Sequence, residues 1–347
     1  MKTLLPDFIK QIKISPDLAI LLGTAAEGKG SERVFERTQP EVLNVLRQQA
    51  IISSVESSNR IEGVEIDPQR LNPLLTGKIQ PQDRSEEEVF GYKNALEWIN
   101  KNYDNIIVNP ETICKLHELS QQGMISDAGK WKSKNNQIIE YDQNGKASIR
   151  FTPLEPELVE SAIENLCLAY NDLTKNTKIP ELLLIASFVF DFLCIHPFRD
   201  GNGRVSRLIT HLLLLQHRYQ LVRLISIERV IEETKDAYYE SLKNSSLNWH
   251  LGKHEITYFW RYFIRVINIS YEKLTLKLKT ETSFEGAKTQ LVRNTILTQL
   301  GKFRLSDLKS IEPGISEALI QKVLADLKKE GLIKLIGKGR GAVWVKC

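Results

Sequence analysis

The stretch that decides the fold is His196-Pro-Phe-Arg-Asp-Gly-Asn-Gly-Arg-Val-Ser-Arg207, which lies between the apolar runs LLLIASFVFDFLCI and LITHLLLLQ. The two runs predict buried helices, whereas the polar groups between them are costly to bury unless they are paired or bind a ligand. Because proline and glycine interrupt helices, we expect a loop here and a second helix that begins near Gly203. The sequence therefore predicts a binding site at a break between two core helices.

Several residues of this loop are suited to bind polyphosphate. We expect the amides of Gly201, Asn202 and Gly203 to point toward an anion from the N-terminus of the second helix, where the helix dipole adds to the attraction. Arg204 and Arg207 are three residues apart, so both side chains can face the same anion. The pattern indicates a polyphosphate ligand.

Two further residues indicate a metal ion and a base. Asp200 would be repelled by phosphate unless a divalent cation lay between them, which favours Mg²⁺ bound by one carboxylate and by phosphate oxygens. His196 lies where the first helix ends, and its ordinary pKa is near the working pH, so it is a candidate general base for a hydroxyl nucleophile. The alternative is a core histidine beside a helix break.

The run is similar to the signature of the Fic family, HPFx[D/E]GNGRxxR, at every specified position. The resemblance implies a protein adenylyltransferase (AMPylator), in which His196 deprotonates a Ser, Thr or Tyr hydroxyl of a target protein that attacks the α-phosphorus of ATP. It also implies that Asp200 binds Mg²⁺, that Gly201 to Gly203 cradle the phosphates, and that Arg204 and Arg207 hold the leaving pyrophosphate. Transfer of another phosphate-containing moiety stays open, because a phosphate cradle does not read the base.

A second resemblance lies upstream, where Ser58-Asn-Arg-Ile-Glu62-Gly63 fits the family's inhibitory pattern [S/T]xxxE[G/N]. It implies that Glu62 pairs with Arg207 in the position that the ATP γ-phosphate needs, so the protein is autoinhibited by a helix of its own chain. A plain helix end with a glycine cap is the alternative. A de-AMPylating hydrolase, with Glu62 positioning water, also stays open.

The segment 136–156, NQIIEYDQNGKASIRFTPLEP, has β-favouring residues on both sides of Asn144-Gly145 and predicts a β-hairpin with a type I′ turn. The resemblance implies that this hairpin is the family's flap, which aligns the target peptide by strand addition. A surface hairpin braced by its neighbours is the alternative. Tyr238 and Tyr239 resemble a segment that contacts the nucleotide base, although aromatic residues at these positions also suit a helical core.

Apolar positions three and four residues apart predict a mainly α protein over most of the first 280 residues. We expect an N-terminal helical region carrying the inhibitory helix at 1–105 and a Fic catalytic core with its β-hairpin flap at 106–285. A C-terminal winged-helix-like domain is expected at 286–347. The Fic resemblance spans roughly residues 40–246.

The C-terminal segment differs from the body in charge. Residues 288–347 carry 12 Lys and Arg against 5 Asp and Glu, a net charge of +7, so residues 1–287 carry −3 of the total of +4. Three expected helices followed by a small hairpin resemble a winged helix, in which the third helix and the wing contact DNA. The expected phosphate contacts are Lys322, Lys328, Lys329, Lys338 and Arg340. The rival hypothesis is a DNA-binding regulator whose Fic body only senses nucleotide. The other alternative is that this domain only contacts other proteins or packs against the body.

The bulk properties exclude several classes of protein. With 347 residues, 42% of them hydrophobic, and no long apolar segment, the sequence predicts a globular cytoplasmic protein without a membrane partner. Four scattered cysteines suggest neither a disulfide framework nor a thiolate zinc site. His250 and His254 lack an evident third metal ligand, and no P-loop motif is present. A homo-oligomer is compatible with the sequence, which does not determine the oligomeric state.

Overall fold

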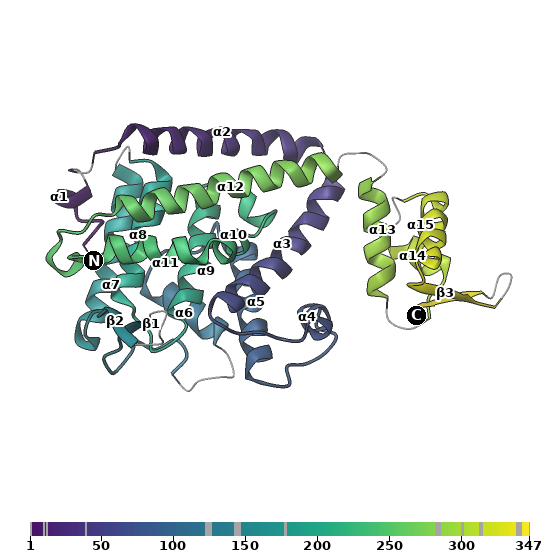
Figure 1. Cartoon of the computed structure of the whole chain (residues 1–347), viewed down its shortest axis with the longest axis horizontal. Helices are drawn as coiled ribbons and strands as arrows, with labels where there is room; N and C mark the ends of the chain where they lie inside the picture. Colours follow the sequence, from purple (N-terminus) through teal and green to yellow (C-terminus); the bar gives the residue numbers. More distant parts are fainter. Residues whose placement is uncertain are drawn as a thin grey trace. The chain divides into compact units, whose positions relative to one another are not determined.

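The computed structural model describes residues 2–9, 11, 13–38, 40–121, 127–141, 147–176, 179–281, 286–299, 302–311, 315–337 and 342–346. The fold over these residues is mainly α-helical, as predicted, and its strands form two-stranded sheets (Figure 1). The helices are α1 (Pro6–Ile9), α2 (Pro16–Thr38), α3 (Pro40–Ile61), α4 (Pro68–Leu75), α5 (Arg84–Asn102), α6 (Pro110–Ser120), α7 (Pro156–Asn176), α8 (Glu181–Ile195), α9 (Asn202–Gln216), α10 (Ile227–Glu233), α11 (Lys235–Ser246), α12 (Thr257–Glu281), α13 (Gly286–Thr298), α14 (Leu305–Ile311) and α15 (Glu317–Lys329), with short 3₁₀ helices η1 (Gln220–Arg223) and η2 (Trp249–Leu251). The strands are β1 (Ile138–Tyr141), β2 (Ala147–Phe151), β3 (Ile333–Ile336) and β4 (Val343–Lys346).

The chain divides into two compact units. Unit 1 comprises residues 1–39 and 46–273, and unit 2 comprises residues 40–45 and 274–347. Helices α1 and α2, the greater part of α3 and the segment that carries the His196 loop therefore belong to the same unit.

Unit 1 is built around helix α8, which packs against α7 and α9. Almost all residues of α8 are buried, in keeping with its nearly continuous apolar sequence. Helix α8 ends at His196 and α9 begins at Asn202, so the polar loop predicted from the sequence joins two helices of the core. The loop is therefore supported on both sides by buried helices.

Two long helices, α2 and α12, run side by side along one edge of unit 1 (Figure 1). Arg261 of α12 forms an ion pair with Asp17 at 2.7 Å, and the Asn268 amide donates to the Leu21 carbonyl at 3.1 Å. A side chain at Gly28 would clash with the ring of Tyr271, so the glycine allows the close approach of the two helices.

A buried carboxylate fixes the N-terminal residues to α8. Asp191 is fully buried and accepts hydrogen bonds from the amides of Lys2 (3.0 Å) and Thr3 (2.9 Å). The Thr3 hydroxyl and the Trp249 indole also donate to it, each at 2.7 Å. Because a buried charge is tolerated only with such partners, this cluster holds α8 in place five residues before His196.

The predicted hairpin is present as the antiparallel strands β1 and β2. Its register changes between Ile138 and Ile139, which pair with Phe151 and Ile149, so Arg150 is the extra residue of a β-bulge. The predicted turn at Asn144-Gly145 lies in residues 142–146, outside the described part of the chain.

Unit 2 contains α13, α14, α15 and the antiparallel hairpin β3–β4, in the order expected from the sequence. Its own hydrophobic core includes Ile296, Phe303, Ile320 and Leu327. Phe303 and Trp344 also form an isolated antiparallel bridge beside the hairpin. On α15, the lysines at 322, 328 and 329 are exposed, whereas Lys338 and Arg340 fall outside the described residues.

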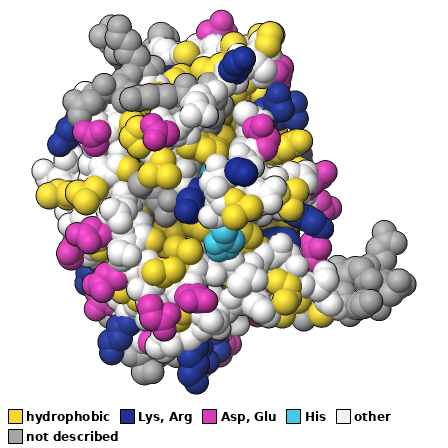
Figure 2. Space-filling view, turned by 90° about the vertical axis from the view of Figure 1, so that its left-hand side faces the viewer, with side chains coloured by type: hydrophobic (Ala, Val, Ile, Leu, Met, Phe, Trp, Pro, Cys, Tyr) yellow, Lys and Arg dark blue, Asp and Glu magenta, His cyan; other side chains and the backbone are white. Residues whose placement is uncertain are grey.

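The surface is mixed in character. Figure 2 shows a face on which basic, acidic and hydrophobic side chains alternate, and the coloured side chains form no large patch of one charge. Over the described ranges, no helix combines the length and the apolar character that crossing a membrane requires.

Candidate active site

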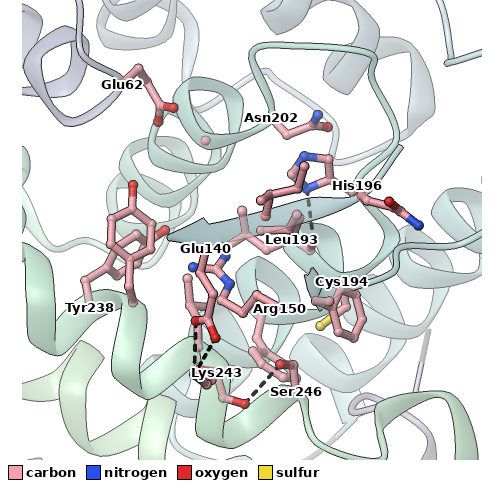
Figure 3. A pocket seen from close by; sticks show the side chains of 18 of the residues that line it. Glu62, Glu140, Arg150, Leu193, Cys194, His196, Asn202, Tyr238, Lys243 and Ser246 are labelled. Atoms are coloured by element: carbon pink, nitrogen blue, oxygen red, sulfur yellow. Dashed lines mark hydrogen bonds and ion pairs between the residues drawn. The ribbon is translucent and has the colours of Figure 1, made fainter. Parts of the chain in front are cut away.

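A pocket of about 850 Å³ lies beside the loop that joins α8 to α9 (Figure 3). This volume lies within the range of pockets that enclose a small organic ligand. The lining residues are Glu62, Gln137, Ile138, Ile139, Glu140, Arg150, Phe151, Phe190, Leu193, Cys194, His196, Arg199, Asp200, Gly201, Asn202, Gly203, Arg207, Tyr238, Tyr239, Glu240, Leu242, Lys243 and Ser246. The loop, the hairpin, α11 and the turn after α3 therefore surround one cavity.

His196 caps the C-terminus of α8 in a left-handed conformation, with φ 52° and ψ 63°. A non-glycine residue in this region costs about 1–3 kcal/mol and is found most often at functional sites. Its Nδ1 lies 3.2 Å from the Leu193 carbonyl oxygen. Since a carbonyl can only accept, Nδ1 carries the proton and Nε2 keeps a free lone pair.

The surroundings of His196 keep its imidazole neutral. Burial lowers the pKa of His196 to about 4, and the positive charge of Lys132 contributes in the same direction, while the negative charge of Glu62 acts against it. The neutral ring is the form that can accept a proton. The predicted base is thus in its competent protonation state at neutral pH.

The loop after His196 is shaped by its own side chains. The Asn202 carboxamide accepts from the Phe198 amide at 2.9 Å and donates to the Phe198 carbonyl at 2.8 Å, so Asn202 closes the loop on itself. Gly201 adopts φ 77°, which suits glycine, and immediately precedes α9. Its amide donates to the Asp200 carboxylate at 2.7 Å. The sequence predicted a free amide at Gly201, so this prediction is wrong. The amides of Asn202 and Gly203 lie in the first turn of α9, which provides no carbonyl partner for them.

His117 of α6, which no sequence motif marks, supports this loop from behind. Its Nδ1 accepts from the Gly129 amide at 2.9 Å, so Nε2 carries the proton and donates to the Asp200 carbonyl at 3.1 Å. Its ring stacks on Phe198 with centroids 3.8 Å apart and planes 8° apart. Burial lowers the pKa of His117 to about 4, so the ring is neutral at neutral pH, and its two hydrogen-bond partners fix the tautomer. No sequence signal links α6 to the loop, because the contact is tertiary.

Two residues before the hairpin also hold the loop. The Lys132 amide donates to the Pro197 carbonyl at 2.8 Å, and its ammonium donates to Asn136 at 2.8 Å. Asn136 in turn donates to the Phe198 carbonyl at 3.2 Å. The segment leading into β1 is therefore tied to the loop that carries His196.

Arg207 makes the contacts predicted for it with the upstream pattern. Its Nε donates to the Ser58 hydroxyl at 2.8 Å, and its Nη2 donates to the Ser58 carbonyl at 2.9 Å and to the Glu62 carboxylate at 2.7 Å. Burial is the largest single influence on the pKa of Arg207 and lowers it, but the charge and hydrogen bond of Glu62, together with Tyr92 and Tyr238, outweigh burial, so the pKa is raised. A Cβ atom at Gly203 would clash with the Glu62 carboxylate, so this carboxylate lies against the first turn of α9.

Arg204 does not face the pocket together with Arg207, contrary to the expectation from their spacing. Its guanidinium is buried and forms an ion pair with Glu88 of α5, which also pairs with Arg84 at 2.9 Å. Arg204 is not among the lining residues, because the buried Glu88 carboxylate attracts it toward α5. Its predicted contact with the leaving phosphates therefore has no support in this geometry.

The far side of the pocket is formed by α11 and the hairpin. Tyr238 and Tyr239 both line the pocket, as a base-contacting segment would, and their assigned role stays a prediction. Arg150 of β2 lies over the Tyr239 ring, 5.2 Å from its centroid. Lys243 of α11 forms an ion pair with Glu140 of β1 at 2.7 Å, which fixes the hairpin to the helix.

Comparison with known proteins agrees with this geometry. Residues 107–214 match the model of the Fic/DOC family. A Fido domain-containing protein from Dictyostelium discoideum is 30% identical over 100 residues, which is 29% of this chain and 66% of that protein. The protein adenylyltransferase fic-1 from Caenorhabditis elegans is 27% identical over 207 residues, or 57% of this chain and 35% of that protein, so the chain spans less than two thirds of both relatives.

The fold also resembles a solved structure. A Fic family protein from Desulfovibrio desulfuricans G20 superimposes with a TM-score of 0.63 at 19% identity, covering 97% of each chain. The family match contains the whole loop from His196 to Arg207 and its support His117. The chain therefore contains a domain of the Fic/DOC family, supplied by residues 107–214.

Proposed function

We propose that this protein is a protein adenylyltransferase that moves AMP from ATP to a Ser, Thr or Tyr hydroxyl of a target protein. The observation that carries the proposal is the pocket itself. It brings the free Nε2 edge of His196 together with the glycine-rich start of α9 and with Arg207. A base beside a polyphosphate site is what nucleotidyl transfer to a hydroxyl needs. The relationship to C. elegans fic-1, whose name is protein adenylyltransferase, supports the same reaction class.

In the proposed reaction, the target hydroxyl oxygen attacks the α-phosphorus of ATP. A new bond forms between that oxygen and the α-phosphorus, the bond from the α-phosphorus to the bridging oxygen breaks, and pyrophosphate leaves. The hydroxyl proton passes to Nε2 of His196. The hairpin β1–β2 lines the same pocket and would align the target segment by strand addition.

The phosphates would lie at the first turn of α9. The amides of Asn202 and Gly203 and the guanidinium of Arg207 are the donors available there. The adenine base of the nucleotide would then extend toward Tyr238 and Tyr239 on α11. A different transferred moiety would be revealed by the mass it adds to the target.

Mg²⁺ fits this site with one protein ligand. Over the described residues, no cluster of three or more His, Cys, Asp or Glu side chains gathers to hold a metal by itself. Asp200 is 57% exposed, lines the pocket and could turn from the Gly201 amide toward a cation shared with phosphate oxygens. When bound, Mg²⁺ would neutralise charge on the leaving pyrophosphate.

We also propose that Glu62 inhibits the enzyme. Its carboxylate is bonded to Arg207 and lies against Gly203, where the terminal phosphate of ATP would otherwise bind. Ser58, on the last turn of α3, holds the same guanidinium from the other side. ATP must therefore displace a residue of the chain itself before it binds productively.

The test of the transfer reaction is His196→Ala in a Glu62→Gly background, with ATP labelled at the α-phosphate. The parent variant should label itself or a protein in a lysate, and the double variant should not. Unchanged ADP affinity in the double variant would show that its pocket is intact. Persistent labelling without His196 would refute its role as the base.

A second function is favoured by unit 2. We propose that its three helices and hairpin form a winged-helix-like domain that binds DNA, because Lys322, Lys328 and Lys329 are exposed on its third helix, α15. In a gel shift with the full chain and a random DNA duplex, changing Lys322 and Lys329 to Gln should weaken binding and reduce the slope of log K against log salt by about 2. The same changes at the exposed Lys101 and Lys175 serve as control. A slope that is equal in both double variants would contradict DNA binding by α15. Cytoplasmic location and a homo-oligomer remain predictions.

A further inference from the structure

Arg150 is a pocket cation that the sequence motifs do not include. It lines the cavity from strand β2, and Figure 3 shows its side chain among the lining residues, between the labelled Glu140 and Cys194 in that view. The β-bulge at Arg150 explains this direction, because a bulge re-aims the side chain of its extra residue. The neighbouring Ile149, by contrast, is exposed. The hairpin thus directs one guanidinium into the site.

The other cations of the pocket differ from Arg150 in their surroundings. Arg207 is bonded to Glu62, and Lys243 is bonded to Glu140. Arg199 is exposed to solvent, where its charge is screened. Arg150 is partly buried over the Tyr239 ring, and it forms an ion pair with no carboxylate in the described part of the chain. A partly buried guanidinium with only an aromatic partner is available for an anionic ligand.

The charge balance of the proposed reaction requires an anion near this residue. Burial lowers the pKa of His196, and the charge of Arg150 contributes in the same direction. When His196 takes the proton from the target hydroxyl, a second positive charge forms in the same pocket. Two neighbouring cations are unfavourable unless an anion lies with them. The anion that the reaction itself brings next to His196 is the phosphate that is transferred.

We infer that Arg150 binds the α-phosphate of the nucleotide from the hairpin side, opposite the phosphate cradle at the start of α9. This inference rests on the proposed transfer reaction and adds a residue that contacts the reacting phosphate. The hairpin then has two tasks, because the strand that aligns the target also carries a ligand for the group being transferred. An acidic side chain of the target peptide is the competing partner for Arg150.

Calorimetric titration of the wild type with AMP and with adenosine isolates this contact. The two ligands differ only in the phosphate that corresponds to the α-phosphate of ATP, and AMP has no terminal phosphate to compete with Glu62. Arg150→Gln should weaken AMP binding by about tenfold, the effect of one charge-assisted hydrogen bond, and leave adenosine affinity within about twofold. Arg150→Lys should recover part of the loss, because it keeps the charge but not the fork of donors. Arg265→Gln, at an exposed position of α12 that does not line the pocket, is the control and should change neither affinity.

Each other outcome overturns the inference. An unchanged AMP affinity in Arg150→Gln, together with weaker labelling of protein targets, would assign Arg150 to an acidic group of the target. Equal losses of affinity for AMP and adenosine, at an unchanged melting temperature, would assign Arg150 to a contact with the adenine base. Where Arg150→Gln does not fold, AMP affinity in Arg150→Lys equal to that of wild type would count against the contact, as would the absence of AMP binding by wild type. Failure of Glu62→Gly to label any protein would refute the transfer reaction alone, since AMP binding does not depend on transfer.

Discussion

Removal of the Glu62 carboxylate should increase the affinity for ATP and the rate of AMP transfer. Arg207 makes three hydrogen bonds, and Glu62 supplies one acceptor at 2.7 Å while Ser58 supplies the other two. Glu62→Gly therefore leaves Arg207 fixed in position by α3 but removes the negative charge beside it. The guanidinium becomes available to the terminal phosphate without having to move.

The size of the effect follows from the contact. A hydrogen bond to a charged group contributes about 1.5–3 kcal/mol. The Glu62 side chain is 32% exposed, so solvent screening places its contribution near the lower end, at about 1.5–2 kcal/mol. Since about 1.4 kcal/mol corresponds to a factor of ten, ATP affinity should rise by roughly 10- to 30-fold.

The comparison of ATP with ADP tests the reasoning directly. ADP lacks the terminal phosphate, so calorimetry should find its affinity nearly unchanged in Glu62→Gly while that of ATP increases. Glu62→Gln is the conservative variant for the same test, and Glu56→Gln is its matched control, because Glu56 lies on α3 and pairs with Arg60 away from the pocket. Equal gains for ATP and ADP, or equal labelling by wild type and Glu62→Gly, would show that Glu62 does not occupy the phosphate position.

Three further predictions concern the supports of the site. Burial lowers the pKa of four histidines to about 3–4. As the pH falls, these histidines are therefore protonated in the unfolded chain before they are protonated in the folded chain. The free energy of unfolding should decrease between about pH 6.5 and 4, by up to about 1.4 kcal/mol per pH unit for each histidine. The four are His117, His196, His211 and His254. Urea denaturation across this range checks the slope, and a flat profile would contradict it. Glu88→Ala should lower the free energy of unfolding by about 3–5 kcal/mol in the same assay, because it leaves the buried Arg204 without a partner. Glu87→Ala on the same helix is the control and should lower it only slightly, and equal losses would contradict a buried ion pair. His117→Ala should accelerate hydrogen exchange in residues 196–203 but not in the hairpin β3–β4 of unit 2, and unchanged exchange in the loop would show that His117 does not support it.

The sequence predicted those parts of the site that depend on local chemistry. The loop between two apolar helices, the glycine before α9 and the hairpin were all expected from composition and spacing, because proline, glycine and β-favouring residues act through their own backbones. The pairing of Glu62 with Arg207 was also expected, although only from the family pattern and not from the residues alone. The mainly helical fold followed from the apolar periodicity.

The parts that were missed depend on packing between segments distant in the chain. Spacing allowed Arg204 and Arg207 to share one face of α9, and nothing local indicated that Glu88 lies where it attracts Arg204 away. His117 and Arg150 carry no motif, since one acts through a tertiary contact and the other through a bulge that only the strand register reveals. Such contacts are invisible to a single sequence because they depend on which elements become neighbours.

Donors of the site are paired with carboxylates of the same chain, and the exposure of each carboxylate separates those that can leave from those that cannot. Glu62 and Asp200 are 32% and 57% exposed, so each can leave its donor at little cost. Glu62 returns to water when phosphate binds Arg207, and Asp200 turns from the Gly201 amide to the cation that it shares with phosphate. Glu88 is only 6% exposed, and its departure would leave a buried arginine uncompensated. Nucleotide binding should therefore exchange the first two contacts and preserve the third. The same loop can then accept phosphate without losing the support that α5 provides.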